Sequence, residues 1–556
     1  MKKIKTGKWS TLLAALVLTT GLSGVVQAAD YTTGLTGAYR TDNKLVKGDG
    51  SSVKQQGNET IYDFGGRDQS FSVVNQNAIS FSRAGNHFIV NNVDSNRNKG
   101  TITLRVQNTI PNAFGGATGL NIGSGTTTIH SDLDIQTKAD YLTQGVQVGG
   151  NGTLIIDGNV KMRKDDAENP WGVVTNNVHG NYGPGGYVTN DGLGYTGARW
   201  QPSGFYVGES RGNITVDGDV DIAIRGTAVL TNTYNGADVD PYDLSTITLN
   251  GSSIRIVTPD DERKSDGSFK EAYYSLASFG GTVNVNVKNG EAQNGNVYMI
   301  GNVIASKRSA GTSASDVYQD GRINVALTTK DSYWKGVVDN FSKEQAGEVN
   351  VWLQNGAKWQ HEAASRTNGM DAANMPNYSR PNYGLYDHVS YIHHFYGGTS
   401  SDKTGYLTQN HESQIHIDNY SGYATVIYQH NGSGMEKTDY IGGDTTIVHA
   451  VTGSNITLAT GNNGVDINDS NAVAKVLNAL ASKLIYSNYR NGESNLSGTV
   501  IIASGLTASS VKADVSGMIT FDKKTGAGTY VKPQEGEQNT NRIQGGITGT
   551  TADNAY

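Results

Sequence analysis

The densest group of ionisable side chains is at residues 260–264, which read Asp, Asp, Glu, Arg and Lys. Carboxylates beside a basic group are what acid–base cleavage of a polysaccharide requires. All five residues fall in one contiguous stretch, whereas a groove on a repetitive scaffold would collect its residues from several repeats. We therefore interpret the stretch as a solvated charged loop, and keep a secreted polysaccharide lyase or hydrolase as the alternative function.

Three histidines near an aspartate form the second chemical candidate. His388, His393 and His394 follow Asp387 closely, and imidazole with carboxylate is a common metal-ligand set. The surrounding segment is rich in tyrosine, and we therefore interpret the three as surface histidines of an aromatic loop. We predict no metal, no cofactor and no catalytic residue in this chain.

Two aromatic segments, residues 181–207 and 377–396, interrupt the regular sequence pattern of the chain. We expect both to be loops that project from the scaffold, where tyrosine and tryptophan rings bind a glycan or protein ligand or cover the scaffold edge. The candidate ligand-binding residues are Tyr182, Tyr187, Tyr195, Trp200, Tyr206, Tyr378, Tyr383, Tyr386, Tyr391 and Tyr396.

A short β-strand motif recurs along the chain, and we expect it to supply the scaffold. It usually opens with glycine and then alternates aliphatic with polar residues, as in GTLIIDG at residues 152–158 and GNITVDG at 212–218. Further copies begin at residues 245, 281, 321 and 347. Alternation buries one side of each strand, and repetition of one strand unit predicts a solenoid. The expected fold is all-β.

Composition agrees with a long, thin core. Glycine supplies 71 of the 556 residues and proline only 9, while 36% of the residues are hydrophobic, which suits many turns and short strands. The 44 basic residues are outnumbered by 51 acidic ones, giving a net charge of −7. This balance and the lack of a basic stripe argue against nucleic acid as a partner.

The first 28 residues have the pattern of a secretory signal peptide. Lysines at positions 2, 3, 5 and 8 precede an apolar run at 12–18 and small residues up to Ala28. The chain contains no cysteine, so disulfides cannot stabilise it after export. We expect an exported protein, held together by packing and backbone ladders.

The remaining chain divides by pattern. We predict an irregular N-terminal cap at 29–70, a β-helix at 71–465, a helix-interrupted C-terminal part at 466–530 and a polar disordered tail or linker at 531–556. Apolar spacing predicts one amphipathic helix from Ser470 to Tyr489, capped by Asp469 or Ser470 and stopped by Gly492, which plugs or flanks the solenoid.

Several stretches resemble the passenger domains of autotransporters, the type V secretion proteins, from Gram-negative anaerobes. The resemblance lies in INVALTTKDSYWKG at 323–336, VNVWLQNGAKW at 349–359 and, more specifically, VLNALASKL at 476–484, GESNLSG at 492–498 and ITFD at 519–522. It covers about residues 70–530, with its strongest part after about residue 320.

The resemblance implies a right-handed parallel β-helix that is displayed on the cell surface or released, and acts in adhesion or aggregation by binding host or bacterial surface ligands. It also implies an outer-membrane β-barrel translocator, and we expect none to be encoded after Lys523. A passenger fragment, a truncated product and a passenger served by another protein all stay open. A purely structural stalk is a third functional class.

Overall fold

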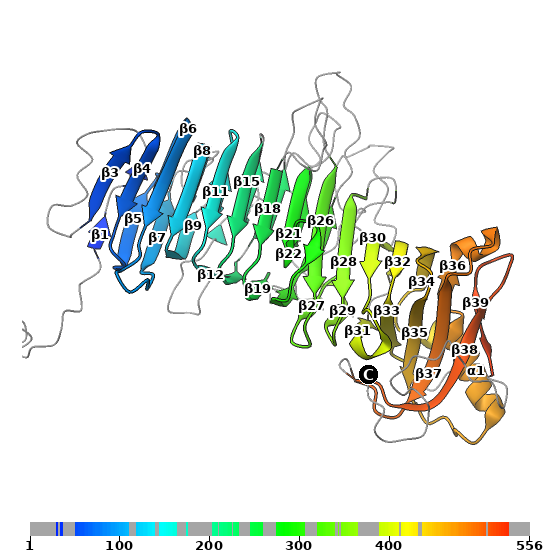
Figure 1. Cartoon of the computed structure of the whole chain (residues 1–556). Coiled ribbons are helices and arrows are strands. Elements are labelled where there is room, and N and C mark those ends of the chain that lie inside the picture. The colour runs from blue at the N-terminus through cyan, green and yellow to red at the C-terminus, as the bar shows by residue number, and fades with distance from the viewer. Residues whose placement is uncertain are drawn as a thin grey trace, which may run out of the picture.

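The computed structural model describes residues 29–31, 34–36 and most of 51–532. Within the last range the gaps are 110–117, 140–143, 164–173, 176–202, 209–210, 225, 233–244, 259–273, 306–319, 340–342, 344–345, 365–388, 411–412, 432–435 and 508–509. The strands stack into one elongated β-solenoid, with the N-terminal strands at one end and the C-terminal strands at the other (Figure 1). The all-β fold class and the parallel β-helix are confirmed.

Ladder 1 is one of three parallel stacks and runs the length of the solenoid. Its strands are β1 (Ala29–Tyr31), β5 (Gln69–Val74), β7 (Thr101–Asn108), β9 (Asp132–Ala139), β12 (Val160–Arg163), β16 (Val220–Ala223), β19 (Ser253–Val257), β24 (Asn296–Ile300), β27 (Tyr333–Lys335), β29 (Lys358–His361), β31 (Gly405–Gln409), β33 (Tyr423–Tyr428), β35 (Ser454–Gly461) and β37 (Leu496–Ala503). The short strand β13 (Val174–Thr175) also pairs with β9.

Two further parallel ladders share the long strands β6 (Ile79–Asn91) and β8 (Thr118–His130), whose two halves pair separately. Ladder 2 adds β2 (Leu35–Thr36), β10 (Gln144–Val148), β14 (Ser203–Gly208), β17 (Thr227–Asn232), β20 (Tyr274–Ser278) and β25 (Asn302–Ala305). Ladder 3 adds β3 (Ser52–Gln56), β4 (Glu59–Asp63), β11 (Gly152–Ile156), β15 (Gly212–Val216), β18 (Ser245–Leu249), β21 (Gly281–Val285), β26 (Gly321–Leu327), β28 (Glu348–Leu353), β30 (Val389–Tyr396), β32 (Gln414–Ser421), β34 (Thr445–Ala450) and β36 (Leu484–Tyr486).

The copies of the repeated β-strand motif form one continuous part of ladder 3. Its six copies are β11, β15, β18, β21, β26 and β28, which pair in this order. Their first aliphatic positions are in register and fully buried, forming a column of Leu154, Ile214, Ile247, Val283, Ile323 and Val349. Alternation therefore predicted both the strands and the side that faces the core.

The N-terminal region is more regular than predicted. Strands β3 and β4 form an antiparallel hairpin, and β4 already pairs in parallel with β6. The solenoid therefore begins before residue 71, the start that the sequence pattern predicted. A second hairpin, β22 (Val287–Lys288) with β23 (Glu291–Ala292), leaves the solenoid at one corner.

The C-terminal end is closed by a helix and antiparallel strands. Helix α1 (Ser470–Ala481) is capped by Asp469, whose side chain accepts hydrogen bonds from the backbone of Asn471 and Ala472, as predicted. The helix ends eight residues earlier than predicted, because Leu484–Tyr486 forms β36 and pairs with β34. Strand β38 (Ala513–Phe521) then runs antiparallel to β37, and β39 (Gly528–Val531) runs antiparallel to β38.

Three short 3-10 helices complete the described elements: η3 (Ser401–Lys403), η4 (Lys437–Asp439) and η5 (Ser487–Asn491). Gly492 ends η5, not α1, and adopts the left-handed φ of 92° there. In the described part of the chain, no helix has both the length and the apolar composition needed to cross a bilayer.

Candidate functional site

The predicted aromatic residues separate into three groups in the structure. Tyr182, Tyr187, Tyr195, Trp200, Tyr378, Tyr383 and Tyr386 lie outside the described residues. Tyr206 lies in strand β14 and is only 3% exposed, so it is a packing residue and the prediction of a loop there is wrong. Tyr391 and Tyr396 lie in strand β30, which also replaces the end of the second predicted loop, and both keep partial exposure.

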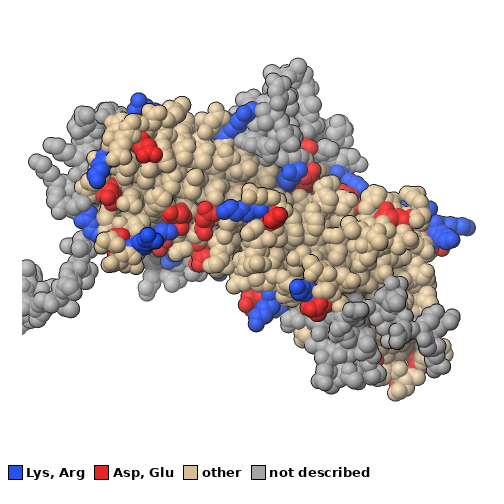
Figure 2. Space-filling view, in the orientation of Figure 1, with Lys and Arg blue, Asp and Glu red and all other residues tan. Residues whose placement is uncertain are grey.

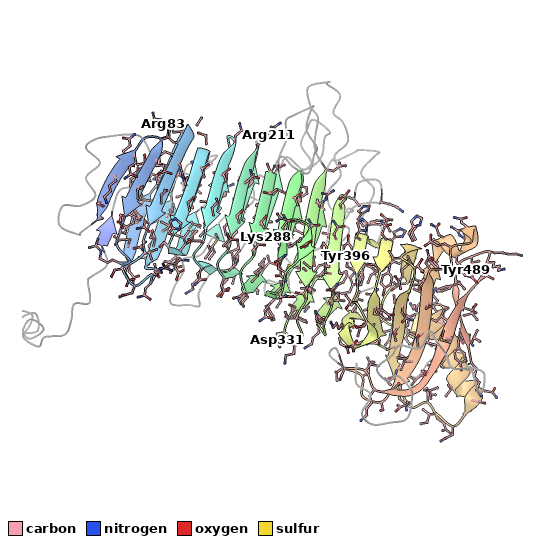
Figure 3. The ribbon with its side chains drawn as sticks, viewed as in Figure 1. Arg83, Arg211, Lys288, Asp331, Tyr396 and Tyr489 are labelled. Atoms are coloured by element: carbon pink, nitrogen blue, oxygen red, sulfur yellow. The ribbon has the colours of Figure 1, made fainter. Side chains whose placement is uncertain are left out.

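Tyr396 is stacked on Trp352 on the outer side of ladder 3. The two residues are register partners on β30 and β28, and their ring centroids lie 4.4 Å apart with an interplanar angle of 15°. The ring of His394 is also nearly parallel to that of Tyr396, at 5.6 Å. Burial raises the pKa of Tyr396. The rings are thus fixed by the strands that carry them (Figure 3).

A shared irregularity turns extra side chains outward beside these rings. Two consecutive residues escape burial in three successive strands: His393 and His394 in β30, Asp418 and Asn419 in β32, and Val448 and His449 in β34. The register places His394 beside Asn419 and Asn419 beside His449. In a β-bulge, two successive side chains point to the same side of the strand, and the bulge thereby changes the direction in which side chains project.

Asp418 is the centre of a charged network on this surface. Its carboxylate lies 3.4 Å from His393, 3.3 Å from His416 and 3.4 Å from Lys343. Burial acts to raise the pKa of Asp418, but the histidine hydrogen bonds and the lysine charge outweigh it and hold the pKa far below its usual range. The same hydrogen bond raises the pKa of His393, whereas burial lowers the pKa of His394.

A second ion pair extends the network toward the preceding coil. Arg322 donates from Nε to Glu348 at 2.6 Å, and His393 lies 4.0 Å from the same carboxylate. We call the whole surface the aromatic–histidine patch, and its members are Arg322, Lys343, Glu348, Trp352, Tyr391, His393, His394, Tyr396, His416 and Asp418. It draws on four successive coils of ladder 3.

A row of amides leads along the solenoid to this patch. Asn350 donates to Asn324 at 2.8 Å, Asn324 donates to Asn284 at 2.7 Å, and Asn284 donates to Thr248 at 3.2 Å. Each side-chain amide donates a hydrogen bond to a side chain one coil away, as in the side-chain ladders of stacked strands. The row makes the outer surface stiff on one side of the patch.

Histidines of the patch pair with its carboxylates. Among the residues that the structure describes, no three His, Cys, Asp or Glu side chains are grouped to hold a metal ion. His393 and His394 belong to the patch, while Asp387 and His388 lie outside the described residues. The charged stretch 260–264 also lies outside them, so the loop interpretation stays a prediction.

Sequence reasoning found Tyr391 and Tyr396 but missed Trp352, His416 and Asp418. Alternation within GEVNVWL puts Trp352 on the polar side with Glu348 and Asn350, and this signal could have identified it. His416 and Asp418 carry no comparable signal, because their proximity to β30 depends on the length of the intervening coil.

Comparison of the chain with protein-family models, with curated proteins and with solved structures found no match.

Proposed function

We propose that this protein is an exported, surface-displayed or released β-solenoid that binds an extracellular protein or glycan through the aromatic–histidine patch. The observation that supports this most is the solvent-facing stack of Trp352 on Tyr396 beside the Asp418 network. Tryptophan, tyrosine and arginine are the residues that carry most binding energy at protein interfaces. The biological role is adhesion or aggregation at the cell exterior.

Rigidity of the patch favours this role over a merely exposed surface. Strand β30 is paired with β28 on one side and with β32 on the other, so its outward rings have little freedom to lose when a ligand binds. Charges of both signs around the rings supply hydrogen-bond donors and acceptors for a polar rim.

An autotransporter-like export route is part of the proposal. It is supported by the signal-peptide pattern of residues 1–28, by the absence of cysteine from the sequence and by the stretches that resemble passenger domains. An outer-membrane β-barrel translocator is the expected export partner in this proposal, and nucleic acid is not a partner.

Binding assays with the full chain test the role of the patch. We expect the chain to bind mucin, matrix proteins or sibling cells, and we expect Trp352→Ala and Tyr396→Ala each to weaken that binding about tenfold or more. Tyr423→Ala removes a partly exposed tyrosine from strand β33 of ladder 1, outside the patch, and is the matched control. Equal binding by wild type and both patch variants would contradict the proposal.

The two alternatives make different predictions. A polysaccharide lyase or hydrolase would cleave members of a polysaccharide panel and lose that activity on mutation of one carboxylate, whereas our proposal predicts no cleavage of the panel or of casein. A structural stalk would bind none of the tested surfaces, so it separates from the adhesin in the same assay.

A further inference from the structure

A polar groove of about 520 Å³ lies on the outer side of ladder 1, in the N-terminal half of the solenoid. It crosses strands β9, β12, β16 and β19, and its lining comprises Thr101, Asp132, Leu133, Asp134, Asn159, Val160, Lys161, Asp219, Val220, Asp221, Ser253 and Arg255. Figure 2 shows acidic side chains gathered, with Lys and Arg among them, near β7, β9 and β12. The groove runs along the solenoid axis.

The outward side chains of the groove alternate in charge from one coil to the next. Asp134 is the register partner of Lys161, Lys161 of Asp221, and Asp221 of Arg255. Neighbouring parallel strands lie about 4.8 Å apart, so equivalent charges recur at roughly twice that distance. Arg255 also pairs directly with Asp221 at 3.0 Å.

One wall of the groove is held by side chains that bind the backbone of the following coil. Asp132 accepts from the backbone N–H of Asn159 at 2.8 Å, Asn159 accepts from Asp219 at 2.9 Å, and Asp219 accepts from Ser253 at 2.9 Å. These contacts fix the wall before any ligand arrives, which lowers the entropic cost of binding.

Two tyrosines continue the same outward row beyond the groove. Arg255 is the register partner of Tyr298, and Tyr298 is the partner of Tyr333. The guanidinium lies 5.8 Å from the ring centroid of Tyr298, and the two tyrosine rings are 5.6 Å apart. Tyr298 is 39% exposed. Burial raises the pKa of Tyr333 to about 12, so the Tyr333 phenol is neutral at pH 7.

The lining argues against several kinds of occupant. Four aspartates against one lysine and one arginine leave it two charges negative, which repels a phosphate backbone. Strands β12, β16 and β19 are paired on both sides, so a peptide cannot add to them as a further strand.

We infer that this groove binds a linear polysaccharide that lies along the solenoid axis. Sugar hydroxyls hydrogen-bond to the carboxylates of Asp134 and Asp221, which lie two coils apart, and to the guanidinium of Arg255 on the next coil. The apolar faces of the sugar rings pack on Tyr298 and Tyr333, which offer amphipathic rings in the same row. The excess of carboxylates favours a neutral or amine-bearing glycan over a uronate glycan.

This site is separate from the aromatic–histidine patch, which lies on ladder 3. The test uses the full chain titrated by calorimetry with three probes: hexamers of β-linked glucose, of glucosamine with free amines, and of galacturonate. The glucose or glucosamine hexamer is expected to bind, and the galacturonate hexamer is expected to bind at least about tenfold more weakly.

Variants locate the binding. Arg255→Gln and Tyr298→Ala are each expected to weaken hexamer binding about tenfold, while Tyr298→Phe retains the ring and the affinity. Arg83→Gln removes a charge near the N-terminal end of the solenoid and is the control (Figure 3). Thermal melts of each variant confirm that the fold is kept.

Three outcomes would overturn the inference. They are no binding of any hexamer by the wild-type chain, tighter binding of galacturonate than of the other two, and unchanged binding by both groove variants. Loss of hexamer binding in Tyr396→Ala alone would assign the glycan to the patch, and would leave the proposed function standing while this inference fails.

Discussion

Trp334 and Trp359 lie one above the other in the solenoid core, with ring centroids 4.3 Å apart and an interplanar angle of 7°. Each indole N–H donates to a glycine carbonyl at a corner, Trp334 to Gly301 and Trp359 to Gly336, both at 3.0 Å. The same side chain therefore makes the same hydrogen bond in two successive coils. This pair explains structurally the two tryptophan-containing stretches noted in the sequence.

Trp334→Ala is expected to lower the free energy of unfolding by about 3–5 kcal/mol, because it leaves a cavity and an unpaired Gly301 carbonyl. Urea unfolding followed by circular dichroism measures the loss. Trp352→Ala removes a stacked but outward tryptophan and should cost much less. Equal costs for the two variants would show that burial of Trp334 contributes little.

Gly321→Ala is expected to be strongly destabilising. A Cβ at this position would lie 2.1 Å from the carbonyl oxygen of Ser278, so the corner between ladders 2 and 3 would have to open. Gly461→Ala is the matched control, since its Cβ would meet its first neighbour at an ordinary 3.6 Å. Melting temperatures compare the two, and a Gly321→Ala protein as stable as the control would refute the steric explanation.

The Asp418 network predicts a pH-dependent stability. The pKa of His393 is raised, so its contribution is complete below the unfolded value of 6.5 and is lost as the pH rises through the folded pKa. The pKa of Asp418 is lowered, so its contribution is complete above the unfolded value of 3.8 and is lost as the pH falls through the folded pKa.

The difference in melting temperature between wild type and Asp418→Asn should therefore be largest between pH 3.8 and 6.5. His416, Lys343 and Glu348 also face this network. Asp331→Asn, at an exposed turn of another coil, serves as a comparison for general effects of pH. A difference that does not vary with pH would contradict the assignment.

Asp469→Ala is expected to lower stability by about 1 kcal/mol, because it removes both side-chain caps from the start of α1. Asp469→Asn keeps an acceptor oxygen and should recover most of the loss. Hydrogen exchange of the α1 amides reports the effect locally. Unchanged exchange in Asp469→Ala would mean that packing against the solenoid end alone holds the first turn.

The sequence predicted the elements whose pattern is local. Alternation of apolar and polar residues in the repeated β-strand motif identified six strands and their buried sides, because a strand with one exposed side must alternate in this way. It failed for Tyr206, since all six residues of β14 are buried and no alternation remains to be read. The helix was predicted too long because Leu484 continues the apolar spacing of α1, and pairing with β34 overrides that local signal.

The patch and the groove could not be predicted in full because coil length varies. Asn159 and Asp219 are one coil apart in space and 60 residues apart in sequence, whereas Asn324 and Asn350 are only 26 apart. Without a constant period, the sequence does not show that Asp418 reaches His393 or that Lys161 lies beside Asp221. Only residues on one strand, such as Tyr391 and Tyr396, could be grouped in advance.

The antiparallel strands at the C-terminal end have a consequence for how copies of this protein meet. A parallel solenoid that ended on β37 would offer a template on which the first coil of another copy could continue the stack. Strand β38 occupies that edge in the opposite direction, and β39 is short and lies against α1, where Tyr530 donates to Asn478. The free edge of β37 is thus already paired with β38, and another copy cannot continue ladder 1 by pairing with β37.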